Sequence, residues 1–88
     1  MSTKIIDLIS PAQCRGARAL LDINQTQLAL AANLGLSTVV DFERKRRQVS
    51  VDAVAAMRIA LEQKGIEFIN ENGGGPGVRL RKRQLKKS

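Results

Sequence analysis

The sequence predicts a mainly α-helical protein, in which four helices form one small domain and a β-hairpin follows them. Three observations predict this fold class. Residues suited to cap a helix start precede segments whose apolar residues recur every three or four positions. A short turn at 33–35 separates two of these segments. Beyond Gly65 the apolar period changes from helical to alternating, which is typical of strands.

Composition supports one domain and limits its function. The chain has 88 residues with 43% apolar content, enough to close an aliphatic core but not to build a deep enzyme cleft. It has no His and a single Cys14, so we expect no catalytic acid/base set, metal or cofactor, and a reducing cytoplasm as its compartment. Aromatic residues make up only 2%, which disfavours base stacking on single strands or RNA.

The positive charge is unevenly distributed. The formal net charge is +7, which indicates a polyanionic partner, either duplex nucleic acid or an anionic membrane. Six basic residues and no acid lie in 78–88, so the remainder has nine bases against all eight acids. Four of those nine are consecutive, at Arg44–Arg47. The short apolar run near the N-terminus is interrupted by Asp7, so we expect neither a signal sequence nor a membrane span.

The first elements are an arm and a helix. Residues 1–9 mix β-branched and polar residues and are expected to form an extended arm or short strand. Ser10 followed by Pro11 is typical of a helix start, because Ser accepts a hydrogen bond there and Pro lacks an N–H that would be unpaired. A helix to about Asp22 follows. Its predicted inward stripe consists of Cys14, Ala17, Leu20 and Leu21.

Two short helices come next, the first of them capped by Asn24. This helix spans about 25–32, and the turn Asn33–Gly35 ends it with residues that tolerate the left-handed backbone conformation. The second spans about 36–45. On a helical wheel Val39 and Phe42 lie on its inner side, and the opposite side carries Ser37, Val40, Asp41 and Arg44.

The last helix and the hairpin complete the fold. Ser50 caps a helix over about 51–64, which Gly65 ends. Its apolar stripe is Val54, Met57 and Leu61, whereas Ile59 points away, toward the arm, a second subunit or solvent. The segments 66–69 and 78–81 are predicted to pair as strands within a hairpin over 65–81. Such a ribbon is marginal alone and needs a partner surface. Residues 82–88 are predicted to be a disordered basic tail.

Residues 12–61 resemble the small helix-turn-helix regulators of the lambda-repressor and Cro type. The resemblance rests on Arg18–Leu21, Asn24–Ala29, Ala32–Val39 and Phe42–Arg44. The C-terminal part, with 65–69 and 73–80, is similar to the end of a subgroup of very short bacterial regulators of this family. The resemblance therefore implies a helix-turn-helix DNA-binding domain over residues 10–64.

The resemblance also implies roles for individual residues. In this family the third helix lies in the major groove, and its base-reading positions fall here on Leu36, Ser37, Thr38, Val40 and Asp41. Phosphate contacts are expected from Gln25, Thr26, Arg44, Lys45, Arg46 and Arg47. Arg18 and Glu43 match the family's ion pair, which joins the first helix to the third.

Two residues depart from the family pattern. Leu36 stands where Gln or Arg is common, so it can offer only an apolar contact to a thymine methyl group. Asp41 brings negative charge toward the groove, where it either accepts a hydrogen bond from cytosine or holds Arg44 in place. We therefore expect base recognition to use few hydrogen bonds, and DNA shape and phosphate contacts to supply much of the affinity.

Several features have a plainer interpretation beside the functional one. Arg44–Arg47 is either a phosphate clamp or a solvated loop. The tail is either a nonspecific arm along the duplex or a solubilising end, and six full neutralisations would steepen the salt dependence of log K by about 5 units. The glycine-rich segment 73–77 is read as a hairpin turn rather than a phosphate cradle, and Cys14 as core filling rather than a redox sensor.

The sequence thus predicts a cytoplasmic bacterial regulator without a small-molecule ligand. We expect a homodimer that binds an inverted repeat in double-stranded DNA and acts as an autoregulating repressor of a prophage or mobile-element promoter. The dimer contact is expected from the hairpin and the last helix, through Ile59, Ile66, Phe68, Val78 and Leu80, with the arm at 5–9 as an optional further strand. The alternative is a protein-interaction module, such as an antitoxin or an antagonist of another regulator.

Overall fold

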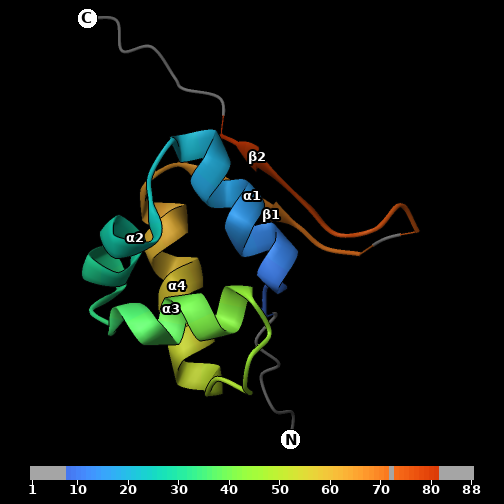
Figure 1. Cartoon of the computed structure of the whole chain (residues 1–88). Coiled ribbons are helices and arrows are strands. Elements are labelled where there is room, and N and C mark those ends of the chain that lie inside the picture. Colours follow the sequence, from blue (N-terminus) through green and yellow to red (C-terminus); the bar gives the residue numbers. More distant parts are fainter. Residues whose placement is uncertain (1–7, 72, 82–88) are drawn as a thin grey trace, which may run out of the picture.

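The computed structural model describes residues 8–71 and 73–81, and within them the chain is mainly helical (Figure 1). The predicted arm up to residue 7 and the predicted basic tail at 82–88 lie outside these residues. The elements are α1 (Pro11–Leu21), α2 (Gln25–Ala32), α3 (Leu36–Glu43), α4 (Val51–Gln63), β1 (Ile66–Ile69) and β2 (Gly77–Leu80). The predicted order of four helices followed by an antiparallel hairpin is confirmed.

Capping residues begin three of the helices as the sequence predicts. The side chains of Ser10, Asn24 and Ser50 each accept a hydrogen bond from a backbone N–H in the first helical turn. In α1 and α2 the third helical residue, Gln13 or Gln27, bonds back to the N–H of the capping residue. These reciprocal bonds satisfy backbone donors that a helix start otherwise leaves unpaired.

Residues in the left-handed backbone conformation follow the ends of α1, α2 and α3. Asp22, Asn33 and Lys45 have φ values of 59°, 59° and 57°. In α3 the N–H of Lys45 bonds to the carbonyl of Phe42, and the N–H of Arg46 bonds to the carbonyl of Asp41. This pair of bonds closes the helix and turns the chain back over its last turn.

The left-handed residues correct two details of the prediction. The helix α3 ends at Glu43, not near Lys45, because the left-handed conformation of Lys45 interrupts the helical bonding. Gly35 has φ −72° and is the capping position of α3, so Asn33 alone supplies the left-handed residue of the turn between α2 and α3.

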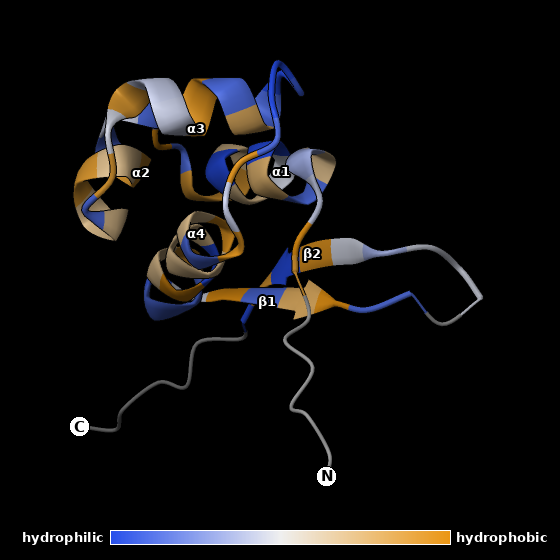
Figure 2. Ribbon diagram, turned by 90° about the horizontal axis from the view of Figure 1, so that it is seen from below, coloured by the Kyte–Doolittle hydropathy of each residue, from blue (hydrophilic) through white to orange (hydrophobic). Residues whose placement is uncertain are grey.

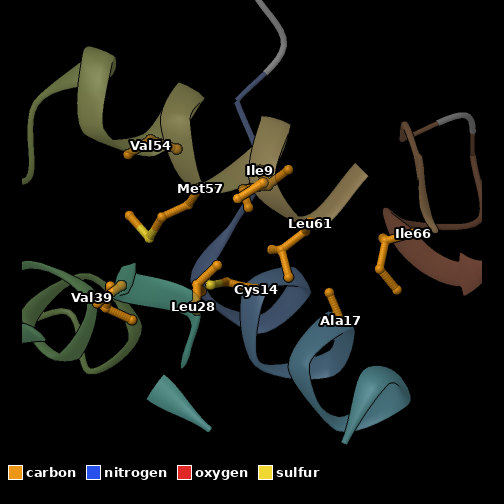
Figure 3. Close-up of a cluster of buried hydrophobic side chains, with 11 residues drawn as sticks. Ile9, Cys14, Ala17, Leu28, Val39, Val54, Met57, Leu61 and Ile66 are labelled. Carbon is orange, nitrogen blue, oxygen red and sulfur yellow. The ribbon is translucent and has the colours of Figure 1, made fainter. Parts of the chain in front are cut away.

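The core lies where all four helices meet the hairpin (Figure 3). Its largest fully buried apolar side chains are Leu28, Met57, Leu61, Ile66, Val39 and Cys14. The prediction was wrong for Leu20, which is 43% exposed. On a helix of 3.6 residues per turn Leu20 lies about 120° from Cys14, whereas Leu21 lies about 20° from it and packs against the core.

The hairpin finds the partner surface it needs within its own chain. The strands pair in the register Ile66 with Leu80 and Phe68 with Val78, so these four share one face as predicted. Strand β2 lies close to α1, because a Cβ on Gly16 would meet Val78 at 3.3 Å. The side-chain amide of Gln13 donates to the carbonyl of Gly77 at 3.0 Å and fixes the start of α1 to the hairpin.

This packing removes Ile66 from the predicted dimer surface and leaves the rest of that prediction open. Ile66 is fully buried in the core of its own chain, and Phe68 and Val78 pack against that core. The helices α1 and α4 cover the apolar face of the sheet, so Ile66 is buried and Phe68 and Val78 are partly buried. Of the predicted set, Ile59 and Leu80 stay about half exposed. Ile9, at the end of the predicted arm, is also buried and is not part of a strand.

The hairpin and α3 lie on opposite sides of the domain (Figures 1 and 2). The segment that follows α3 is among the most hydrophilic parts of the chain (Figure 2). None of the described helices is long and apolar enough to cross a membrane.

Candidate nucleic-acid interface

Helix α3 presents one uncovered side. Val39 is fully buried and Phe42 packs against the core, so they fix the inner side of the helix. The five predicted base-reading residues all retain exposed surface: Leu36 and Ser37 are exposed, and Thr38, Val40 and Asp41 are partly exposed. The turn at Asn33 joins α3 to α2, and the two helices pack together. The outer face of α3 is therefore rigidly held and open to a partner.

A buried carboxylate holds α1, α2 and α3 together. Glu43 is only 2% exposed, although it is charged. Arg18 of α1 donates to both of its oxygens, from Nη2 to Oε1 at 2.7 Å and from Nε to Oε2 at 2.8 Å. Cys14 Sγ donates to Oε2 at 3.1 Å, and Gln25 Nε2 donates to Oε1 at 2.9 Å. We call Glu43, Arg18, Cys14 and Gln25 the Glu43 cluster.

The cluster keeps Glu43 ionised. Burial alone raises the pKa of the Glu43 carboxyl, but the hydrogen bonds from Arg18, Cys14 and Gln25 outweigh it and hold the pKa below its ordinary value. Burial and the adjacent Glu43 carboxylate raise the pKa of the Cys14 thiol well above its ordinary range. Cys14 therefore stays a neutral donor, which agrees with core filling rather than redox sensing.

The predicted ion pair between Arg18 and Glu43 is present. Further hydrogen-bond donors surround it, which the sequence did not indicate. The roles of Cys14 and Gln25 as further donors to Glu43 were missed. Arg15 also contributes, because its Nη1 donates to the backbone carbonyl of Glu43 at 2.6 Å. The polar start of α2 and the apolar position of Cys14 were visible in the sequence, but their meeting at one carboxylate depends on how three helices pack.

The start of α2 lies beside the last turn of α3. Gln25, a predicted phosphate contact, uses one amide hydrogen on Glu43, so its side chain has a fixed orientation. The Asn24 side chain caps the N–H of Gln27, and no described group accepts from the N–H of Gln25 or Thr26. These N–H groups, at the positive end of the helix dipole, remain for an anion.

The basic segment Arg44–Arg47 divides into two parts. Arg47 Nε donates to Asp41 Oδ2 at 2.8 Å, and Arg46 Nη1 lies 4.0 Å from Asp41 Oδ1. Asp41 thus holds Arg47 and, weakly, Arg46, not Arg44 as one interpretation of the sequence expected. The cause is the turn at Lys45, which leads the chain back over α3. Arg44 and Lys45 are exposed and have no acidic partner in the part of the chain that the structure describes.

The glycine-rich loop between the strands does not form a phosphate cradle. Its N–H groups at Gly73 and Gly75 donate to the carboxylate of Glu71 at 3.0 and 3.1 Å. A carboxylate of the chain itself therefore occupies the donors that a phosphate would need. Among the described residues, no cluster of three or more His, Cys, Asp or Glu side chains could hold a metal ion.

No family model matches the chain, and a comparison with curated proteins gives no match. What the protein binds is therefore inferred from the geometry of α2, α3 and the basic segment.

Proposed function

We propose that this protein is a sequence-specific double-stranded DNA-binding regulator of the lambda-repressor and Cro type, with α3 as the helix that enters the major groove. The observation that carries the proposal is the outer face of α3. The fold leaves this face uncovered, anchors its opposite side through Val39 and Glu43, and places positive charge directly after it. A helix that carries short polar side chains outward from a rigid anchor suits groove reading.

Phosphate contacts supply most of the affinity in this proposal. Arg44 and Lys45 are exposed and unpaired within the described chain, so binding them to phosphate breaks no ion pair. The N–H groups of Gln25 and Thr26 provide a second contact at the start of α2. Both groups of contacts lie near the C-terminal end of α3, since Gln25 bonds to Glu43 and Arg44 follows it, and together they would fix the register of α3 in the groove.

Base recognition would fall to Leu36, Ser37, Thr38, Val40 and Asp41. Ser37 and Thr38 can hydrogen-bond to base edges, whereas Leu36 and Val40 favour thymine methyl groups. Few polar groups are available, so DNA shape is expected to add to the discrimination. The mechanism that we propose is promoter occlusion by an autoregulating cytoplasmic repressor, of the kind found in prophages and mobile elements.

The proposed protein acts as a homodimer on an inverted repeat, because one short helix reads only a few base pairs. Ile59 and Leu80 are the predicted contact residues that stay exposed. Removing the hairpin would expose the core around Ile66, so deletion is a poor test of the dimer. Ile59→Asp and Leu80→Asp are expected to lower the mass measured in solution to that of a monomer while the helical circular dichroism is kept.

Footprinting on the DNA that flanks the protein's own gene tests the proposal. The expected result is protection of an inverted repeat at moderate salt. Retention of DNA that is weak and independent of sequence would contradict it and support the alternative, a protein-interaction module.

Two sets of variants locate the surface. Arg44→Ala with Lys45→Ala is expected to weaken binding to all duplexes and to reduce the salt slope by about 2. Arg79→Ala, on the far hairpin, is the matched control and should change neither quantity appreciably.

A further inference from the structure

Asp41 stands at the point where the predicted base-reading face meets the basic segment. It is a partly exposed carboxylate on the outer side of α3, two residues before the buried Glu43. Its oxygens lie 2.8 Å from Arg47 Nε and 4.0 Å from Arg46 Nη1. Asp41 therefore pairs with Arg46 and Arg47, two of the four consecutive cationic side chains that would otherwise be available to DNA phosphate.

We infer that Asp41 is a specificity-determining residue that competes with DNA phosphate for Arg46 and Arg47, and that it releases them where the groove offers its carboxylate a hydrogen-bond donor, as cytosine does. This inference rests on the proposed function and deepens it. Arg46 and Arg47 side chains are each more than half exposed, so both can turn from Asp41 to a phosphate without unfolding any element.

The competition has a simple electrostatic basis. An exposed ion pair contributes little stability, so a phosphate can displace Asp41 from Arg47 at small cost. The displaced carboxylate then faces the major groove, whose edges carry mostly acceptors at guanine and at the thymine carbonyl. Only an amino group, such as N4 of cytosine, gives it a hydrogen bond. On other sequences Asp41 is repelled by the groove and keeps the two arginines.

Asp41 consequently weakens binding to unrelated DNA more than binding to the operator. Discrimination at one position rises because the wrong sequence is penalised, not because the right one gains a strong contact. The remaining cations, Arg44 and Lys45, have no such competitor in the described chain and supply attraction on every sequence. Within the basic segment, Arg44 and Lys45 thus attract any duplex. Arg46 and Arg47 become free for phosphate only where Asp41 finds a hydrogen-bond donor in the groove.

The test uses the full chain and duplexes obtained by selection from random DNA. Affinity for the selected operator and for its scrambled version is measured over a series of salt concentrations. For Asp41→Asn we expect affinity for the scrambled duplex to rise about 10-fold and its salt slope to steepen by about 1 to 2, one unit for each released arginine. Affinity for the operator should change less than about 3-fold, because Asn can still accept from cytosine.

Glu67→Gln is the matched control. Glu67 is an exposed carboxylate that accepts from Arg79 Nε at 2.6 Å, on the hairpin away from α3. The variant changes the net charge by the same amount and also frees an arginine. We expect it to affect both duplexes equally and only slightly. The double variant Asp41→Asn with Arg47→Ala should lose most of the gain on scrambled DNA.

Two outcomes would overturn the inference. One is an equal rise on both duplexes for Asp41→Asn, matched by Glu67→Gln, since that would be a general charge effect. The other is a selected operator in which no position prefers cytosine or adenine, or one in which Asp41→Asn leaves that preference unchanged. Failure of the proposed function would look different: the unaltered protein would select no sequence at all.

Discussion

Two carboxylates of α3, Asp41 and Glu43, lie two residues apart but differ in burial and in role. Glu43 is almost fully buried and receives hydrogen bonds from Arg18, Cys14 and Gln25. Asp41 is partly exposed and holds arginines that are themselves more than half exposed. The first cannot lose its partners without leaving a buried charge, whereas the second can exchange its partners with solvent or a ligand.

The difference shows how one short helix can be held in a fixed position and still present a face that responds to a bound partner. An eight-residue helix has little stability of its own, so its position depends on tertiary contacts. The Glu43 cluster provides these contacts on the inner side and ties α3 to α1 and α2. Because the inner carboxylate fixes the helix, the outer one is free to respond to what binds there.

The largest expected effect comes from breaking the inner pair. Arg18→Ala leaves the buried Glu43 carboxylate without its ionic partner, which costs about 3–5 kcal/mol of the free energy of unfolding. Urea denaturation followed by circular dichroism measures this loss. Arg79→Ala, which breaks an exposed pair on the hairpin, serves as the control and should leave the denaturation midpoint nearly unchanged. Similar losses for the two variants would show that burial does not distinguish these pairs.

The second-largest effect on stability is expected from protonation of Glu43 at acidic pH. The pKa of Glu43 is lower in the folded protein than its ordinary value of 4.5, so its contribution to stability is complete above that pH and is lost as the pH falls below it. The free energy of unfolding is therefore expected to decrease with falling pH below 4.5. In Glu43→Gln this decrease should be shallower, whereas Glu67→Gln should keep most of it. A Glu43→Gln protein whose stability falls with acid as steeply as that of the unaltered protein would contradict a lowered pKa at Glu43.

A smaller loss is expected from Gln25→Ala. This variant removes one hydrogen bond to the Glu43 carboxylate, which corresponds to about 1–2 kcal/mol in thermal or urea unfolding. It should also weaken DNA binding, because the start of α2 loses its fixed side chain. Thr26→Ala, next to it and exposed, is the comparison and should affect binding without a similar loss of stability.

The smallest effect on stability is expected from the outer carboxylate. Asp41→Asn should change the free energy of unfolding by less than about 0.5–1 kcal/mol, since its pair is exposed. The same variant is expected to change DNA discrimination, so stability and binding separate at this residue. A large loss of stability would mean that Asp41, like Glu43, is mainly structural.

Much of the fold was predictable because local signals determine it. The capping residues Ser10, Asn24 and Ser50, the left-handed Asn33 and the alternating pattern after Gly65 each act within a few residues of chain. The end of α3 was misplaced because Lys45 gives no local sign that it takes a left-handed conformation. The burial of Ile66 was also missed, since an apolar strand face does not reveal whether its own chain or another covers it.

The candidate site was predictable in its list of residues but not in its contacts. The outer face of α3 followed from the helical wheel, and the pairing of Arg18 with Glu43 from the resemblance. The donors Cys14 and Gln25 come from two other helices, so only the packing of α1, α2 and α3 brings them to Glu43. The choice of Arg47 over Arg44 as the partner of Asp41 depends on the turn at Lys45.

The central claim is that the outer face of α3 reads DNA. The most direct test compares operator and scrambled duplex for the unaltered protein, Ser37→Ala and Val40→Ala, with folding checked by circular dichroism. We predict that each variant stays folded and loses discrimination, by about 5- to 100-fold, while its affinity for the scrambled duplex is nearly unchanged. Unchanged discrimination in both variants would contradict the claim and place the recognition surface elsewhere.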